Sequence, residues 1–152
     1  LLIVSKLEVS NHLIYHYHMQ IRKISRHLQT DGRKDVGKAP SFGYCASQGI
    51  YYYGYKLHAV CGLSGVTHSF DLTKASVHDI HYLKDIKVEF SNCTVIGDRG
   101  YISAEVQLDL FETENIRLEV PYRINQKEWK PTFPPFAKAR KRIEILFSQL
   151  CD

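Results

Sequence analysis

The sequence predicts an α/β fold in which a mixed β-sheet is flanked by helices. Three observations lead to this fold class. Runs of β-prone residues alternate along the chain with stretches of helical periodicity. A short apolar run at residues 94–96 leads into a glycine-flanked turn that carries Asp98, as at the end of a buried strand. The last segment, residues 136–150, places its apolar side chains at helical spacing on one face.

The first half of the chain supplies the β-prone runs. Residues 1–4 form a short apolar run, and residues 51–60 alternate along a Tyr-rich segment. Gly62 and Gly65 bound a turn that leads into a second β-prone run at residues 66–72. Two such runs joined by a short turn predict a β-hairpin.

Two helices are predicted in the middle of the chain, over residues 78–86 and 103–112. Ser103 is a candidate N-cap for the second, since its hydroxyl can accept a hydrogen bond from a backbone N–H of the first turn. The apolar residues at helical spacing are Ile80, Leu83 and Ile86 in the first helix and Val106, Leu108, Leu110 and Phe111 in the second.

A further strand is expected at residues 116–120, ended by Pro121. The closing helix carries Ile143, Leu146, Phe147 and Leu150 on one face. The complete order is therefore strand, hairpin, helix, strand, helix, strand, helix. This order matches a ribonuclease-H-like α/β fold, in which acidic residues meet at one end of a mixed sheet.

The segment from residue 11 to residue 38 has no sustained helical or strand period. The segment is interrupted by Gly32 and Gly37, and Pro40 follows just after its end. We therefore divide the chain into an irregular N-terminal segment, residues 1–38, and a domain formed by residues 39–152.

Length and composition indicate one globular domain, since the chain has 152 residues, of which 44% are hydrophobic and 24% charged. No apolar run approaches the roughly 18 residues of a membrane span, so we expect a cytoplasmic protein without a membrane partner. The four cysteines are scattered without a Cys-x-x-Cys pair, which favours reduced thiols in the core over a metal site or a disulfide framework.

The net charge of +4 conceals a basic stretch at residues 123–142, which contains seven Lys or Arg residues and one acid. Such clusters attract phosphate backbones, and Tyr122, Trp129 and Phe133 add rings that can stack on unpaired bases. The alternative is a solvated face around the start of a helix. The candidate DNA-binding residues are Lys130, Lys138, Arg140, Lys141 and Arg142.

Two carboxylates are the candidate catalytic residues. Asp98 follows a predicted strand, although an Asp before Arg99 and Gly100 is also typical of a simple turn. Glu144 lies in the basic closing helix, where it can instead form an exposed pair with Arg140 at i,i+4 spacing, worth a few tenths of a kcal/mol.

From about residue 39 onward, the chain resembles the catalytic domain of bacterial insertion-sequence transposases of the DDE type. Four short segments carry the resemblance through their order and spacing. They are residues 52–58 (Tyr-Tyr-Gly-Tyr-Lys-Leu-His), 75–79 (Ala-Ser-Val-His-Asp), 97–101 (Gly-Asp-Arg-Gly-Tyr) and 140–144 (Arg-Lys-Arg-Ile-Glu).

This resemblance implies a DNA transposase that cuts an insertion sequence and transfers its strands. It implies that Asp98 and Glu144 are catalytic and that both ligate metal, with two Mg²⁺ (or Mn²⁺) ions in an intact site. The implied partner is DNA, as transposon ends and target, and a homo-oligomer is expected.

Other residues of the resembling segments stay outside the candidate catalytic set. Asp79 is expected near the start of a helix, where a carboxylate interacts favourably with the helix dipole. Tyr53, Tyr55 and Lys56 are candidates for DNA contact from the hairpin, but alternating residues on a strand more often pack within a sheet.

The chain departs from the family pattern at the first acid, which the family places at the end of the first strand, typically as Asp followed by Ser. Here the apolar run at residues 1–4 continues into Ser5 without an Asp. The upstream carboxylates, none at the expected position, are Glu8, Asp31 and Asp35. Ala137 and Cys151 also occupy positions where family members often have Tyr and Lys.

These departures suggest a fragment or frameshifted remnant of a transposase gene, with residues from about 5 to 38 out of the ancestral frame. Three functions follow as hypotheses: an active metal-dependent strand transferase, a non-catalytic basic DNA-binding remnant, and an unrelated Mg²⁺ nuclease on the same fold. Strand joining separates the first hypothesis from the other two.

Overall fold

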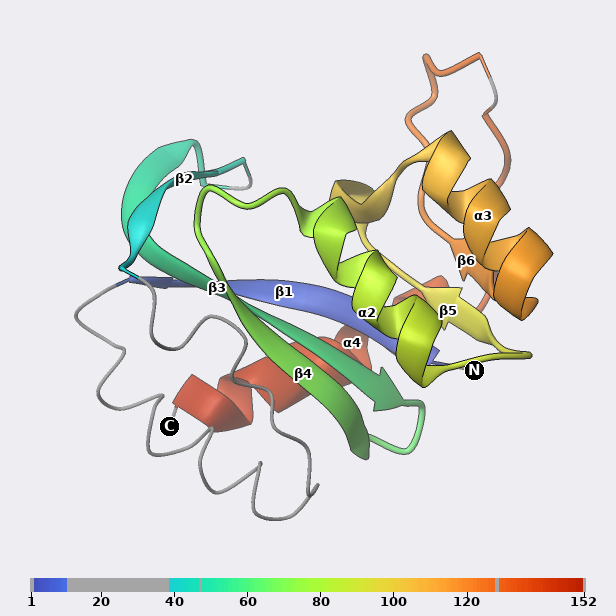
Figure 1. Cartoon of the computed structure of the whole chain (residues 1–152), viewed down its shortest axis with the longest axis horizontal. Coiled ribbons are helices and arrows are strands. Elements are labelled where there is room, and N and C mark those ends of the chain that lie inside the picture. Colours follow the sequence, from blue (N-terminus) through green and yellow to red (C-terminus); the bar gives the residue numbers. More distant parts are fainter. Residues whose placement is uncertain (1, 11–38, 47, 128, 152) are drawn as a thin grey trace.

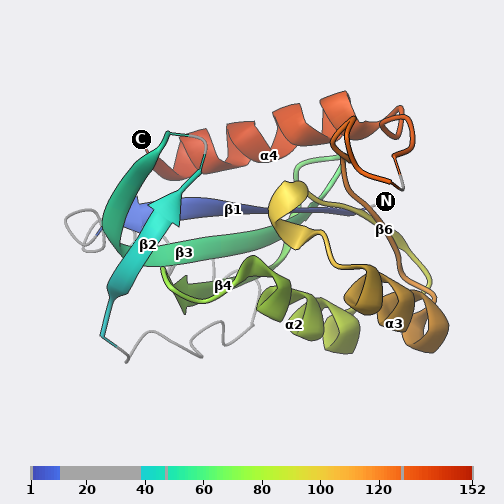
Figure 2. The ribbon, with the colours of Figure 1, turned by 90° about the horizontal axis from the view of Figure 1, so that it is seen from above.

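A six-stranded mixed sheet forms the centre of the computed structural model, with helices on both of its faces (Figures 1 and 2). The structure describes residues 2–10, 39–46, 48–127 and 129–151. The strands are β1 (Leu2–Ser10), β2 (Ser41–Cys45), β3 (Ile50–Gly62), β4 (Thr67–Lys74), β5 (Thr94–Ile96) and β6 (Arg117–Glu119). The helices are α2 (Tyr82–Glu89), α3 (Ala104–Glu114) and α4 (Phe136–Cys151), with short 3-10 turns η1 (Asp79–His81) and η2 (Arg99–Tyr101).

The strand order explains how distant segments meet. The sheet runs β4-β3-β1-β5-β6, and β2 pairs with the first part of β3. β1, β3 and β4 are antiparallel neighbours, whereas β5 and β6 run parallel to β1. The predicted fold class is confirmed: this is a ribonuclease-H-like mixed sheet flanked by helices.

β1 is longer than the predicted strand at residues 1–4. It pairs with β3 over nine residues, from Leu2 opposite Gly62 to Ser10 opposite Gly54. Residues 6–10 alternate polar and apolar side chains, so the local sequence carried a strand period that the prediction did not use. The expectation for residues 11–38 lies outside the described residues.

The other predicted elements are confirmed with small changes at their ends. β3 and β4 form the predicted hairpin, and β5 covers residues 94–96 as expected. Ser103 caps α3, since its Oγ accepts a hydrogen bond from the backbone N of Val106. β2 was not predicted, because its five residues gain their partners only by pairing with β3.

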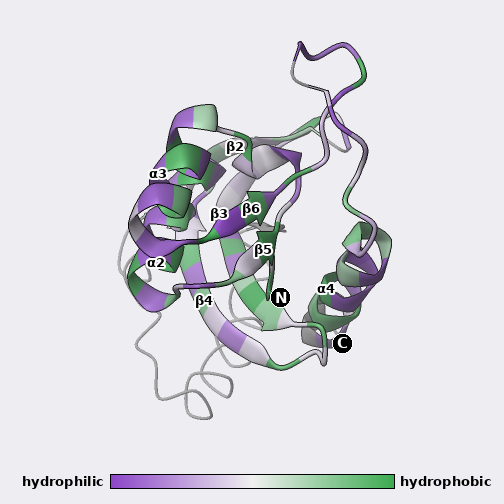
Figure 3. Ribbon diagram, turned by 90° about the vertical axis from the view of Figure 1, so that its right-hand side faces the viewer, coloured by the Kyte–Doolittle hydropathy of each residue, from purple (hydrophilic) through white to green (hydrophobic). Residues whose placement is uncertain are grey.

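Two apolar clusters attach the helices to the sheet. β3 alternates between them, as the period of two in a strand requires. Tyr55, Leu57, Ala59 and Cys61 join the cluster under α4, and Val60 joins the cluster under α2 and α3. Figures 2 and 3 show α4 on one side of the sheet and the other two helices on the opposite side.

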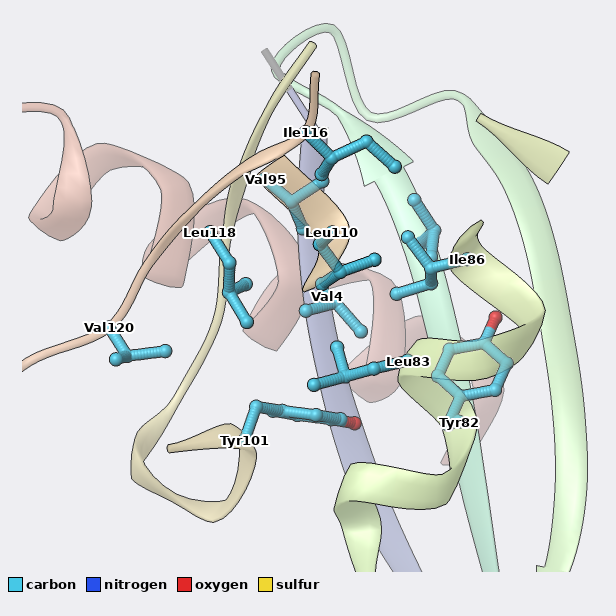
Figure 4. Close-up of a cluster of buried hydrophobic side chains, with 11 residues drawn as sticks. Val4, Tyr82, Leu83, Ile86, Val95, Tyr101, Leu110, Ile116, Leu118 and Val120 are labelled. Carbon is cyan, nitrogen blue, oxygen red and sulfur yellow. The ribbon is translucent and has the colours of Figure 1, made fainter. Parts of the chain in front are cut away.

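The cluster on the α2 and α3 side contains Leu83, Ile86 and Leu110 from the helices (Figure 4). Leu108 and Phe111, two of the apolar residues that indicated this helix, are 57% and 55% exposed. α3 lies over the short strands β5 and β6, which offer room for only part of its apolar surface.

Two of the predicted core thiols, Cys45 and Cys61, are buried, and Cys93 is partly buried. These three side chains are not in disulfides, and Cys61 has no exposed surface. Burial raises the pKa of the Cys61 thiol to about 11, so it stays protonated at neutral pH. Within the described residues, no helix combines the length and apolar character needed to cross a bilayer.

Candidate active site

Asp98 lies in a tight turn where the chain leaves β5. β5 ends at Ile96, and the backbone N of Gly97 still donates to the carbonyl of Glu119 at 2.9 Å, which continues the sheet pairing. Asp98 then caps η2, because its Oδ1 accepts a hydrogen bond from the backbone N of Gly100 at 2.8 Å. Its half-buried carboxylate thus has the turn-forming role considered as an alternative, and this role fixes its position at the strand end.

Gly100 is the narrow point of this turn. A Cβ placed there would overlap Oδ2 of Asp79 and would lie 3.1 Å from Oδ1 of Asp98. Two carboxylates therefore flank the α-carbon of Gly100 closely. Only glycine leaves room for both of them.

We expect Gly100→Ala to lower the free energy of unfolding by about 1–3 kcal/mol, since the added methyl must displace a carboxylate in a packed turn. Thermal or denaturant unfolding followed by circular dichroism measures this change. Gly65→Ala is a comparison variant: it has open space around its Cβ but a positive φ of 89°, so its cost arises from the backbone alone. Equal stability of Gly100→Ala and the natural chain would contradict the crowding argument.

A buried ion pair lies directly behind the turn. Nζ of Lys56, on β3, is 3.0 Å from Oδ1 of Asp79 and donates to the carbonyl of Val77 at 2.8 Å. The Lys56 and Asp79 side chains are only 10% and 6% exposed. Asp79 does begin η1, as predicted, and Lys56 packs inside the sheet region.

Sequence reasoning missed this ion pair because its partners are 23 residues apart. One signal was available. Lys56 and His58 are both polar, and they occupy alternate positions on one side of a strand that is otherwise apolar. Two polar residues on one buried face require polar partners from another element.

His58 is the second polar residue on this face of β3, and it is fully buried. One ring nitrogen lies 2.8 Å from the hydroxyl of Tyr101, and the other lies 3.0 Å from Oγ1 of Thr73. The ring of Tyr82 stacks on the imidazole, with the centroids 4.9 Å apart. Tyr101 is the last residue of η2 and is fully buried (Figure 4), so this hydrogen bond ties the Asp98 turn to the sheet.

Glu144 lies on α4, on the other side of the sheet. Its side chain is 59% exposed, and its Oε1 accepts a hydrogen bond from Nε of Arg140 at 2.8 Å. The exposed i,i+4 pair considered from the sequence is therefore present. Ala139, Ile143 and Phe147 bury the opposite face of the helix.

In the part of the chain that the structure describes, a full set of acidic ligands does not come together. Across residues 2–10, 39–46, 48–127 and 129–151, no three His, Cys, Asp or Glu side chains are grouped closely enough to hold a metal ion. Asp98 has Asp79 as its acidic neighbour across Gly100, whereas Glu144 pairs within its own helix.

The register of β1 locates the position of the missing first acid. In the parallel pairing, Leu2 is opposite Val95 and Ile3 is opposite Ile96. Extended by two residues, the same register sets Ser5 level with Asp98. Glu8, the one acid of β1, is three residues further along, or about 10 Å, and is opposite Lys56.

The five candidate DNA-binding residues are all exposed. Lys138, Lys141 and Arg142 lie on α4 with Arg140, which pairs with Glu144. Nζ of Lys130 is 3.4 Å from Oε2 of the buried Glu119 and lies over the ring of Tyr122. Of the three interleaved rings, Trp129 is half exposed, while Tyr122 and Phe133 pack partly against the two clusters.

The strand order and the helices on both faces of the sheet are those of a ribonuclease-H-like domain. The family model described as the transposase DDE domain matches residues 16–152, and the chain belongs to that family. The match begins upstream of residue 39, where the resemblance was placed. No curated protein and no solved structure matches the chain significantly.

Proposed function

We propose that this transposase-family domain acts on DNA phosphodiesters, with Asp98 and Glu144 as carboxylates for divalent metal ions. One observation carries the proposal: the Gly100 amide holds the Asp98 carboxylate just after the end of β5, which runs parallel to its two neighbours, β1 and β6. Since β1 has Ser5 level with Asp98, we expect much lower turnover than from a complete set of three acids.

The chemistry of the donors suits hard cations. Carboxylate oxygens are the preferred ligands of Mg²⁺ and are also suitable for Mn²⁺. When bound, a pair of such ions activates the attacking oxygen and stabilises the leaving oxygen of an in-line displacement. The residues of this chain orient the carboxylates: Gly100 donates to Asp98, and Arg140 donates to Glu144.

The exposed cations of α4 supply the DNA contact in this proposal. Arg140 and Lys141 precede Glu144 by four and three residues, and the backbone phosphates of DNA attract such clusters irrespective of base sequence. Transposon ends and target DNA are the expected substrates. Assembly into a homo-oligomer stays a prediction.

A second candidate function is DNA binding without catalysis. Two observations favour it: Ser5 stands level with Asp98 on β1, and Glu144 is engaged by Arg140 at the surface. In that case the exposed cations of α4 bind DNA, and Asp98 and Glu144 have no chemical role.

One experiment separates the candidates. The full chain is incubated with supercoiled DNA and Mn²⁺, and nicking and strand joining are followed on gels. We expect slow cleavage that Asp98→Asn and Glu144→Gln abolish, whereas Asp109→Asn, at an exposed acid of α3, leaves it unchanged. DNA binding without Asp98-dependent cleavage supports the non-catalytic candidate, and hydrolysis without joining supports a nuclease.

DNA binding is measured in the same preparation as a function of salt. Removing two phosphate contacts with Lys138→Ala/Lys141→Ala should lower the slope of log affinity against log salt by about 1.8. Lys84→Ala, an exposed Lys of α2 on the other side of the sheet, serves as the control. An unchanged slope in the double variant would remove α4 from the DNA interface.

A further inference from the structure

We infer that the buried Lys56–Asp79 ion pair is a positioning device for Asp98, assisted by the hydrogen bond between His58 and Tyr101. The inference rests on the proposed metal-ligating function of Asp98. It assigns a role to Lys56, Asp79 and His58, which do not themselves have to contact DNA or metal. Three steps lead to it.

The first step is the geometry around Gly100. Oδ2 of Asp79 lies against Gly100 where a Cβ would stand, while Oδ1 of Asp79 binds Lys56. The backbone N of the same Gly100 donates to Oδ1 of Asp98, which lies near the same position. The Asp79 side chain is therefore part of the packing that holds in place the donor that orients the Asp98 carboxylate.

The second step concerns the cost of burying charge. Taking a Lys and an Asp out of water is expensive, and well-packed apolar residues commonly stabilise a core as well or better. Stability alone thus gives no reason for an ion pair under this turn. A hydrogen-bonded pair does define one geometry, because Lys56 must satisfy both Asp79 and the Val77 carbonyl.

The third step is that two neighbouring residues of η2, Gly100 and Tyr101, are held by contacts that lead back to the same strand, β3. Lys56 acts through Asp79 at Gly100, and His58, two residues along β3, binds the hydroxyl of Tyr101. Thr73 of β4 binds the second ring nitrogen of His58 and so fixes the orientation of the imidazole. These contacts fix the position of the turn that carries Asp98 relative to β3 and β4.

The test uses the full chain and the double variant Lys56→Met/Asp79→Asn. This variant removes one positive and one negative charge, so the net charge near Asp98 is unchanged, and both new side chains are close in shape to the old ones. Its matched control is Lys87→Met/Asp109→Asn, which removes the Lys–Asp pair between α2 and α3, where Nζ and Oδ2 are 2.8 Å apart at the surface.

Two quantities are measured, besides unfolding temperature. Hydrogen exchange by NMR reports the protection of the Gly100 amide, and titration reports the Mn²⁺ affinity. We expect at least tenfold faster exchange at Gly100 with unchanged protection of β3, and an Mn²⁺ affinity about tenfold weaker, as for other residues that orient ligands. The control pair should change neither quantity.

Wild-type protection at Gly100 together with wild-type Mn²⁺ affinity in the folded double variant would overturn the inference. If Asp98→Asn leaves Mn²⁺ binding unchanged in the natural chain, the proposed metal role fails, and exchange at Gly100 still decides whether the pair positions the turn. If the double variant does not fold, the more conservative Asp79→Asn replaces it: faster exchange at Gly100 supports the inference, and unchanged exchange overturns it.

Discussion

Replacing Ser5 with Asp is expected to raise the rate of Mn²⁺-dependent DNA cleavage by on the order of a hundredfold, comparable to the cost of deleting one preorganised group from an active site. The β1–β5 register, extended by two residues, sets position 5 level with Asp98. An acid there would supply the third carboxylate, which the family places at the end of the first strand. Initial rates of plasmid nicking measure the gain.

Ser10→Asp is the matched control, because it adds the same acid at the far end of the same strand, opposite Gly54. The gain from Ser5→Asp must also disappear when Asp98→Asn is added. An equal gain from Ser10→Asp would show a nonspecific effect of charge. If Ser5→Asp gives no gain while Glu8→Gln reduces the original rate, Glu8 is the first acid and the register argument fails.

Ile143→Ala is expected to lower the free energy of unfolding by about 2–5 kcal/mol, because it empties a packed site between α4 and the sheet. Ile143 is 3% exposed and belongs to the cluster that also contains Leu57 and Phe70. The same helix offers a close control in Ile145, which is 40% exposed. Ile145→Ala should change stability by no more than about 0.5 kcal/mol.

Urea unfolding of the two variants tests this difference. Because α4 carries Glu144 and most of the candidate DNA-binding residues, Ile143→Ala should also weaken DNA binding as temperature rises, while Ile145→Ala should not. Similar stability of both variants would mean that α4 contributes little to the fold. The attachment described for Ala139, Ile143 and Phe147 would then be incorrect in solution.

The local spacing of apolar residues was sufficient to predict most of the strands and helices. β3 alternates over its length, and α4 places Ile143 and Phe147 one turn apart, so each element displays its own period. Pattern failed where an element depends on a distant partner. The whole of β2 is a strand because β3 lies beside it, whereas the second half of β1, with its alternating residues 6–10, had a local signal that was overlooked.

For the candidate site, the sequence located Asp98 and Glu144 through their motifs but not the contacts that hold them. Gly100 looked like an ordinary turn residue, and only the folded chain shows two carboxylates against it. Lys56 and Asp79 meet through the hairpin and the start of η1. Such contacts depend on the order in which strands and helices are arranged in space, and the local sequence around either residue does not reveal that order.

The dual role of β3 limits how the gene can change. Odd-numbered residues such as Leu57 face α4, and even-numbered ones such as Lys56 and His58 face the Asp98 turn. Deleting one codon in the middle of this strand would exchange the two sides, sending charge under α4 and apolar side chains toward η2. Length variation should therefore accumulate at the open turns around Gly49 and Gly65, while the strand between them keeps its length.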